Sequence, residues 1–120
     1  MKPNKFIELS ESGKLSSEDL NNYIQVGGDI DYKDNRGITA LGYAVNNKHI
    51  TVIALLLESG ANPYHKFHDK CIVNLFEYPY YNQSDLYQLC RLSQSFQMII
   101  NLQIHEWISD LNNKLINKLN

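Results

Sequence analysis

The stretch DNRGITALGYAVNNKHITVIALLLESGA, from Asp34 to Ala61, decides how the chain folds. Its apolar residues predict two short helices, one from Ala40 to Asn46 and one from Thr51 to Ser59 that ends at Gly60. The second helix is apolar on more than one face, through Val52, Ile53, Leu55, Leu56 and Leu57. Such a helix needs neighbours on both sides, so we expect the flanking sequence to complete the fold.

The order of residues in this stretch follows a known repeat pattern with a period of about 33 residues. The matching positions are Asp34, Gly37, Thr39, Leu41, Ala44, His49, Ile50, Leu56, Leu57, Gly60 and Ala61, with Val52 and Ile53 as aliphatic equivalents. On these residues the segment from about Asp34 to Lys66 resembles one repeat of the ankyrin family. The resemblance implies a stack of helix pairs that binds proteins and does not catalyse.

Three positions depart from the family pattern. Ala40 replaces the proline that starts the first helix, Gly42 replaces a histidine, and Lys48 replaces the glycine between the two helices. That last position usually needs a left-handed backbone, which costs a residue other than glycine about 1 kcal/mol. Asn47 or Asn46 is expected to take this geometry instead, because asparagine tolerates it better.

The sequence upstream predicts a degenerate N-terminal capping repeat over residues 1–33. GGDIDYKD, Gly27 to Asp34, resembles the linker between two repeats. Phe6 to Leu15 is expected to form the first helix of this unit. SSEDLNNYIQVGG is expected to form the second, with Ser17 as its N-cap. The polar outer face of this helix suits a repeat at the end of a stack.

Downstream the repeat pattern decays into a degenerate third unit, over residues 67–93. Its linker and first helix are expected between Asn62 and Tyr78, with Leu75 at the family's leucine position after about one inserted residue. Cys71, Val73 and Asn74 then occupy the places of glycine, threonine and proline, and Pro79 ends the helix. YYNQSDLYQLCRL is expected to form the second helix, with Ser84 or Asp85 as its N-cap.

A long amphipathic helix is predicted at the C-terminus, within residues 94–120. From Ser95 to Lys118 the apolar residues recur at spacings of mostly three and four: Phe96, Ile99, Ile100, Ile104, Trp107, Ile108, Leu111, Leu115 and Ile116. We expect this helix to cover the open end of the stack, with Trp107 in the core. A break at Ser93 or Ser95 is favoured over one continuous helix from Asp85.

These units predict a single all-α domain, 1–120, built as an ankyrin-repeat-like stack of about three helix-turn-helix units with a C-terminal capping helix. The chain has 120 residues, 43% of them hydrophobic, which indicates a folded protein. Its formal net charge of −2 gives no indication of nucleic-acid binding. No signal peptide or membrane span is apparent, and two cysteines suit a reducing compartment, so we expect a cytoplasmic protein.

The candidate catalytic and metal-binding residues do not form a recognisable motif. These are His49, His65, His68, Cys71, Cys90 and His105. Their spacing matches no standard zinc site, and no local motif pairs either cysteine with a histidine. Gly27 and Gly28 belong to a repeat linker and not to a phosphate-binding loop. We therefore predict no metal, no cofactor and no enzymatic activity.

The resemblance implies that a partner contacts the loop tips and the concave face of the first helices. These positions are Tyr32, Lys33, Asn35, Arg36 and Ile38 in one tip, Asn46, Asn47 and Lys48 on the helix, and His65, Lys66 and His68 in the next tip. A tyrosine cluster, Tyr78, Tyr80 and Tyr81, is a further candidate, because interfaces concentrate binding energy on tyrosine. The alternatives are solvated polar residues, and tyrosine rings that cover the edge of the core.

The function that we expect is binding to one protein partner. A small bacterial immunity or antitoxin-type protein that blocks one toxin fits the size of the chain, which is expected to be a monomer apart from that partner. A secreted effector or a viral host-interaction protein would use the same surface. A structural protein that associates with itself through the C-terminal helix is the third alternative.

Overall fold

The computed structural model describes residues 1–68, 70–72, 74, 78 and 80–119, except the side chain of residue 119. Over these residues the chain is all-α, as predicted, with six helices and no strand. The helices are α1 (Pro3–Glu11), α2 (Ser17–Gln25), α3 (Ala40–Asn46), α4 (Ile50–Glu58), α5 (Gln83–Leu92) and α6 (Gln94–Leu119). None of them has both the length and the apolar character that crossing a bilayer requires.

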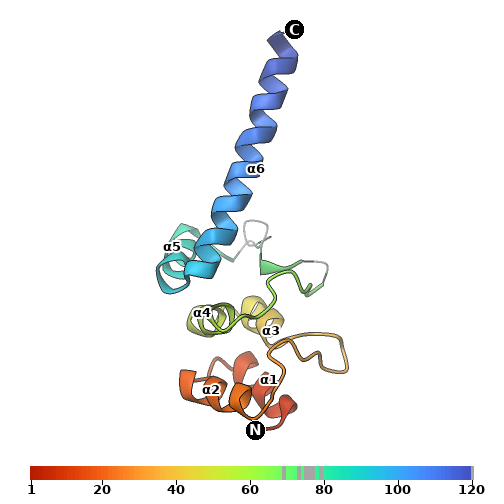
Figure 1. The fold of residues 1–120 in the computed structure, drawn as a ribbon, viewed down its shortest axis with the longest axis vertical. Helices are drawn as coiled ribbons and strands as arrows, with labels where there is room; N and C mark the ends of the chain where they lie inside the picture. Colours follow the sequence, from red (N-terminus) through yellow and green to blue (C-terminus); the bar gives the residue numbers. More distant parts are fainter. Residues whose placement is uncertain (69, 73, 75–77, 79, 120) are drawn as a thin grey trace.

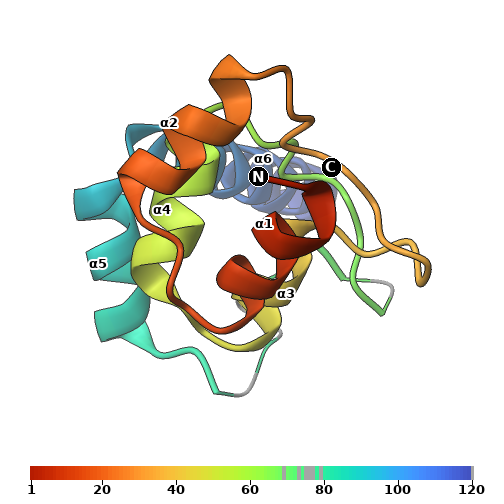
Figure 2. The ribbon, with the colours of Figure 1, turned by 90° about the horizontal axis from the view of Figure 1, so that it is seen from below.

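The helices lie in successive layers along the long axis of the molecule (Figure 1). α1 and α2 form the first layer, α3 and α4 the second, and α5 with the first turns of α6 the third. α1 packs against α3, while α4 packs against both α5 and α6. Seen along the stack, α1 and α3 are neighbours, and α5 lies on the other side of α4 (Figure 2). This arrangement gives α1 and α3 a common face.

The central helix pair forms close to where the sequence predicts it. α3 has the predicted bounds, and α4 begins and ends one residue earlier than predicted. The Thr39 hydroxyl caps α3 by accepting from the backbone N–H of Gly42 at 3.1 Å. Ile53 and Leu56 of α4 are fully buried. The expectation that α4 is covered by its neighbours is confirmed.

The first layer is fixed by a capping box and a ring stack. The N-cap of α2 is Ser16, whose hydroxyl accepts from the N–H of Asp19 at 3.0 Å while the Asp19 carboxylate accepts from the N–H of Ser16 at 3.3 Å. The prediction of Ser17 as N-cap is wrong because only Ser16 has an acidic residue three positions later. The rings of Phe6 and Tyr23 stack at 4.1 Å and join α1 to α2.

α5 also begins earlier than predicted. Its N-cap is Asn82, and the N–H of Asp85 donates to the Asn82 side chain at 3.0 Å. The prediction of Ser84 or Asp85 as N-cap is wrong, because Asp85 supplies the return bond of a capping box at 2.9 Å. The predicted roles of Val73, Leu75 and Pro79 in the preceding helix lie outside the described residues.

α5 and α6 are separate helices, which confirms the predicted break. Ser93 is extended, with φ −135° and ψ 111°. Its hydroxyl donates to the Glu58 carboxylate at 2.7 Å and accepts from the N–H of Phe96 at 3.0 Å. Glu58 also accepts from the N–H of Ser95 at 2.9 Å, and this bond and the one from Ser93 lower the pKa of Glu58. The start of α6 is thereby fixed to the end of α4.

Beyond its first turns α6 projects away from the other helices (Figure 1). Phe96 and Ile100 are buried where the first turns of α6 pack on α4 and α5, whereas residues 101–118 are all exposed. Trp107 is 66% exposed. The prediction that Trp107 lies in the core is wrong, and the prediction that α6 covers the end of the stack holds only for its first turns, which pack on α4 and α5. A helix rises 1.5 Å per residue, so residues after Ile100 extend past the edge of α4 and α5.

This boundary predicts different effects for two truncations in α6. Phe96→Ala should lower the free energy of unfolding by about 3–5 kcal/mol, because it leaves a cavity in the core. Leu102→Ala, at a side chain that is 60% exposed, should change it by no more than about 0.5 kcal/mol. Urea unfolding followed by circular dichroism measures both. Equal losses in the two variants would contradict the described packing.

Candidate functional site

The turn between α3 and α4 contacts the end of α1. The Asn47 side chain donates to the backbone carbonyl of Glu11 at 2.9 Å, and His49 Nε2 donates to the same carbonyl at 2.8 Å. The His49 ring lies so close to Gly13 that a Cβ there would come within 2.6 Å of it. Gly13 also has φ +77°, a conformation that favours glycine. The first layer is therefore fixed in position relative to the second.

Lys48, the middle residue of this turn, contacts the third layer. Its backbone is left-handed, with φ 59°, whereas Asn47 has φ −95°. The expectation that Asn46 or Asn47 takes the strained geometry is wrong. Lys48 Nζ donates to the backbone carbonyl of Tyr80 at 2.8 Å and lies 2.7 Å from the Asp85 carboxylate. These charge-assisted bonds offset a backbone strain of about 1 kcal/mol.

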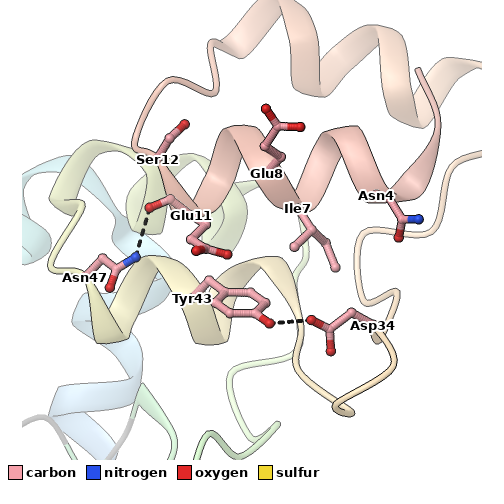
Figure 3. Close-up of a pocket in the computed structure, with 8 residues that line it drawn as sticks. All are labelled: Asn4, Ile7, Glu8, Glu11, Ser12, Asp34, Tyr43 and Asn47. Carbon is pink, nitrogen blue, oxygen red and sulfur yellow. Dashed lines mark hydrogen bonds between the residues drawn. The ribbon is translucent and has the colours of Figure 1, made fainter.

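A hollow of about 370 Å³ opens in front of α1 and α3 (Figure 3). Its lining residues are Asn4, Ile7, Glu8, Glu11, Ser12, Asp34, Tyr43 and Asn47. Ile7 and Tyr43 are buried and give the hollow an apolar floor. The Glu8 and Ser12 side chains point away from α3 and form the outer rim (Figure 3).

The lining of the hollow is acidic. It includes the carboxylates of Glu8, Glu11 and Asp34, and no lysine, arginine or histidine is among its described lining residues. Glu8 has an exposed ion pair with Lys5 at 3.5 Å, of a kind that contributes little. For the Glu11 carboxylate, the described part of the chain supplies neither a hydrogen bond nor an ion pair. Glu11 can therefore accept a cation from outside.

Asp34, in contrast, is already fully engaged. One of its oxygens accepts from the N–H groups of Arg36 and Ile38 at 2.9 and 3.0 Å, and the other accepts from the Tyr43 hydroxyl. Burial alone would raise the pKa of Asp34, but these hydrogen bonds outweigh it and the pKa is lowered. Burial, with the bond to Asp34, raises the pKa of Tyr43 to about 12. Near neutral pH neither group is suited to exchange a proton with a substrate.

The residues predicted for the first loop tip have different surroundings. Lys33, Asn35 and Arg36 are exposed and Tyr32 is half-buried on a loop that protrudes beside α3 (Figure 1). Ile38 is buried against α3, so its prediction as a surface contact is wrong. The cause is the turn closed by Asp34, which directs Ile38 inward.

The binding residues predicted at the end of α3 and in the downstream loop tip are only partly accessible. Asn46 is exposed, while Asn47 lines the hollow and Lys48 pairs with Asp85. In the downstream tip Lys66 and His68 are exposed, and His65 is half-buried. Among the described residues, no three His, Cys, Asp or Glu side chains are grouped so that they could hold a metal ion.

The tyrosine cluster mainly covers the edge of the core. Tyr78 is buried, and the Tyr81 hydroxyl donates to the backbone carbonyl of Val45 at 2.7 Å. Both rings pack edge-on, with centroids 5.9 Å apart. Burial raises the pKa of Tyr81. Tyr78 therefore follows the alternative prediction, in which the rings cover the edge of the core, and Tyr80, at 41% exposed, is the member that a partner could reach.

Of the residues that line the acidic hollow, only Asn47 is among the binding residues predicted from the sequence. Asn4, Ile7, Glu8 and Glu11 recur at helical spacing, which places them on one side of α1. That periodicity is the signal that could have identified this face. No protein-family model, curated protein or solved structure matches the chain.

The bridge from Lys48 to Asp85 predicts a measurable coupling. Lys48→Met should lower the free energy of unfolding by roughly 1–3 kcal/mol, because the Asp85 carboxylate, 13% exposed, loses its cation. The double variant Lys48→Met/Asp85→Asn should lose less than the sum of the single changes. Lys33→Met on the exposed loop is the control in the same urea titration. Equal losses of unfolding free energy in Lys48→Met and Lys33→Met would contradict a stabilising ion pair between Lys48 and Asp85.

The same carboxylates predict how stability depends on pH. The hydrogen bond from Lys48 lowers the pKa of Asp85, and the pKa values of Asp34 and Glu58 are lowered as well. A lowered pKa in the folded state adds stability at neutral pH, which is lost as the pH falls below roughly 5. The thermal midpoint should fall over that range, and less steeply in Lys48→Met. Parallel curves for the two proteins would contradict the assigned cause.

Proposed function

We propose that this chain is a non-catalytic module that binds one partner protein, with a basic segment of the partner in the acidic hollow of α1 and α3. The observation that carries the proposal is the Glu11 carboxylate, which the fold leaves uncompensated above an apolar floor. A lysine or arginine is the matching group, since its apolar stem can lie on Ile7 and Tyr43 while its charge reaches Glu11 or Glu8.

Electrostatics favours the same class of partner. The net charge of the whole chain is only −2, but three carboxylates, those of Glu8, Glu11 and Asp34, line the hollow. A concave surface of one sign attracts a partner of the opposite sign and accelerates association. The loop from Tyr32 to Arg36 lies beside this face, and its exposed residues, Lys33, Asn35 and Arg36, extend the area that a partner could cover.

We further propose that the fold is an ankyrin-like repeat stack. Three local features support this proposal. The Asp34 carboxylate closes the loop before α3, Gly37 has the left-handed φ of +77°, and Thr39 caps α3. These are positions at which the sequence resembles the family. In such a stack the common face of α1 and α3 is the surface on which the family resemblance implies that partners bind.

The specific role that we propose is that of an immunity or antitoxin-type protein. A small domain with one acidic hollow has the surface to block one partner and little area left for several. A toxin that acts on nucleic acid would present a basic cleft, which the acidic hollow would cover. Inhibition would then be steric, with no chemical step performed by this chain.

The test uses the product of the gene adjacent to the one that encodes this chain. That product should inhibit growth when expressed alone, and co-expression of this chain should restore growth. The Glu8→Lys/Glu11→Lys variant should bind it about 100-fold more weakly, since two charge-assisted contacts of about 1.5 kcal/mol each are lost.

The control is Glu18→Lys on α2, which is exposed and lies outside the hollow. Isothermal titration calorimetry measures all three proteins. If no neighbouring gene product is toxic or binds, the immunity role is rejected. If one binds but Glu18→Lys weakens it as much as the double variant does, the hollow is not the binding site.

A further inference from the structure

The exposed part of α6 carries a continuous apolar stripe. It consists of Ile104, Trp107, Ile108, Leu111 and Leu115, which are 42–66% exposed. Their spacings of three and four place them on one side of the helix. Ile100 and Phe96, which are buried against the body, lie on the same side about one and two turns before Ile104. The stripe therefore continues a surface that is already used for packing.

This segment of α6 lacks the contacts that normally stabilise a helix. Residues 101–118 are all exposed, and their charged side chains have one ion pair, between Lys114 and Asp110 at 3.2 Å, in the described structure. Most helical stability in proteins comes from packing of an apolar face, and an isolated helix of about this length is marginal in water. A helix with such a stripe is expected to be covered by another surface.

We propose that α6 pairs in antiparallel orientation with α6 of a second copy of this chain. The stripe defines a symmetric register, in which Ile104 faces the second copy's Leu115 and Ile108 faces the second copy's Leu111. Every apolar layer then has an apolar partner, as in an antiparallel coiled coil. Two such helices would bury on the order of 1,000 Å² in total, the size at which a specific interface becomes stable.

The charges of α6 favour the antiparallel orientation. Glu106 and Asp110 precede Lys114 and Lys118 along the exposed segment. In the antiparallel register Lys114 of one helix lies close to the level of Glu106 of the other, whereas parallel pairing places identical charges at the same level. This attraction acts at a distance, because Glu106 lies on the side of the helix away from the stripe. Antiparallel pairing also brings Lys114 of the second copy within two residues of the level of Trp107, a distance that the long lysine side chain can span to make a cation–π contact.

The shape of the molecule favours the same orientation. The molecule measures 60 × 29 × 26 Å, and α6 extends along its longest dimension from the third layer (Figure 1). Paired helices lie about 8–10 Å apart. Parallel pairing at that distance would make two bodies of this width overlap, whereas antiparallel pairing places the bodies at opposite ends.

A membrane surface is a less suitable binding partner for the stripe than a second copy of α6. Helices that lie on anionic membranes have a polar face rich in lysine and arginine. In residues 101–118 the two lysines are balanced by Glu106 and Asp110. The segment therefore has no net positive charge to attract such lipids, and the charges instead complement a second α6.

The first measurement is the mass of the purified full chain by light scattering at about 100 μM, where a dimer of micromolar affinity is well populated. The expected mass is twice the 13.9 kDa of one chain. A monomeric mass at this concentration would overturn the proposal, including the case in which the monomer co-sediments with vesicles of anionic phospholipid.

Two matched variants then locate the interface. Ile108→Asn lies in the stripe and should weaken the dimer about 30-fold or more, as loss of a central interface residue does. Ile116→Asn changes an equally apolar residue, 55% exposed, that lies off the stripe, and it should leave the dimer intact. Neither residue contacts the body, so hydrogen exchange in α3 and α4 should be unchanged in both. Equal effects of the two variants on the dimer would overturn the assignment of the stripe.

Small-angle X-ray scattering separates the two orientations. Two chains of 60 Å that overlap along an 18-residue helical segment, about 27 Å long, give an antiparallel dimer with a maximum dimension of roughly 90 Å. A parallel dimer would keep a maximum dimension near 60 Å. A dimer of that shorter dimension would overturn the antiparallel arrangement.

Discussion

The turn formed by Asn47, Lys48 and His49 connects all three layers of the molecule. Asn47 and His49 hold the carbonyl of Glu11 at the end of α1, and Lys48 holds Tyr80 and Asp85 at the start of α5. The left-handed backbone of Lys48 is what allows the three side chains to point in these different directions. A glycine at position 48 would adopt this backbone without strain, but it would lose the contact to the third layer.

The position of the hollow follows from this arrangement. α1 and α3 share a face because the turn fixes the end of α1 beside the end of α3, and the Asp34 network fixes the loop on the other side. The acidic face therefore lies on the first two layers, while the stripe of α6 lies beyond the third (Figure 1). Because the two surfaces are apart, binding of a basic partner and pairing of α6 do not exclude each other.

The sequence predicts the fold best where local and tertiary requirements coincide. α3 and α4 are short, bounded by Thr39 and Gly60 and apolar in pattern, so their positions follow from the pattern alone. The N-caps at Ser16 and Asn82 can be identified only if the capping box is considered. In each box the acidic residue three positions later returns a hydrogen bond to the N-cap residue. The exposure of Trp107 could not be predicted, since an amphipathic pattern does not reveal which surface covers it, or whether the same chain provides that surface.

The hollow was missed for a related reason. Its residues come from α1, from α3 and from the loop of Asp34, and only the packing of α1 on α3 brings them together. Native-state hydrogen exchange tests most directly whether the central turn unites the layers. We expect the slowest amides of α1, α3, α4 and α5 to exchange with one common opening free energy. If α1 or α5 opened at a much lower free energy than α3 and α4, the turn would not be the link between the layers.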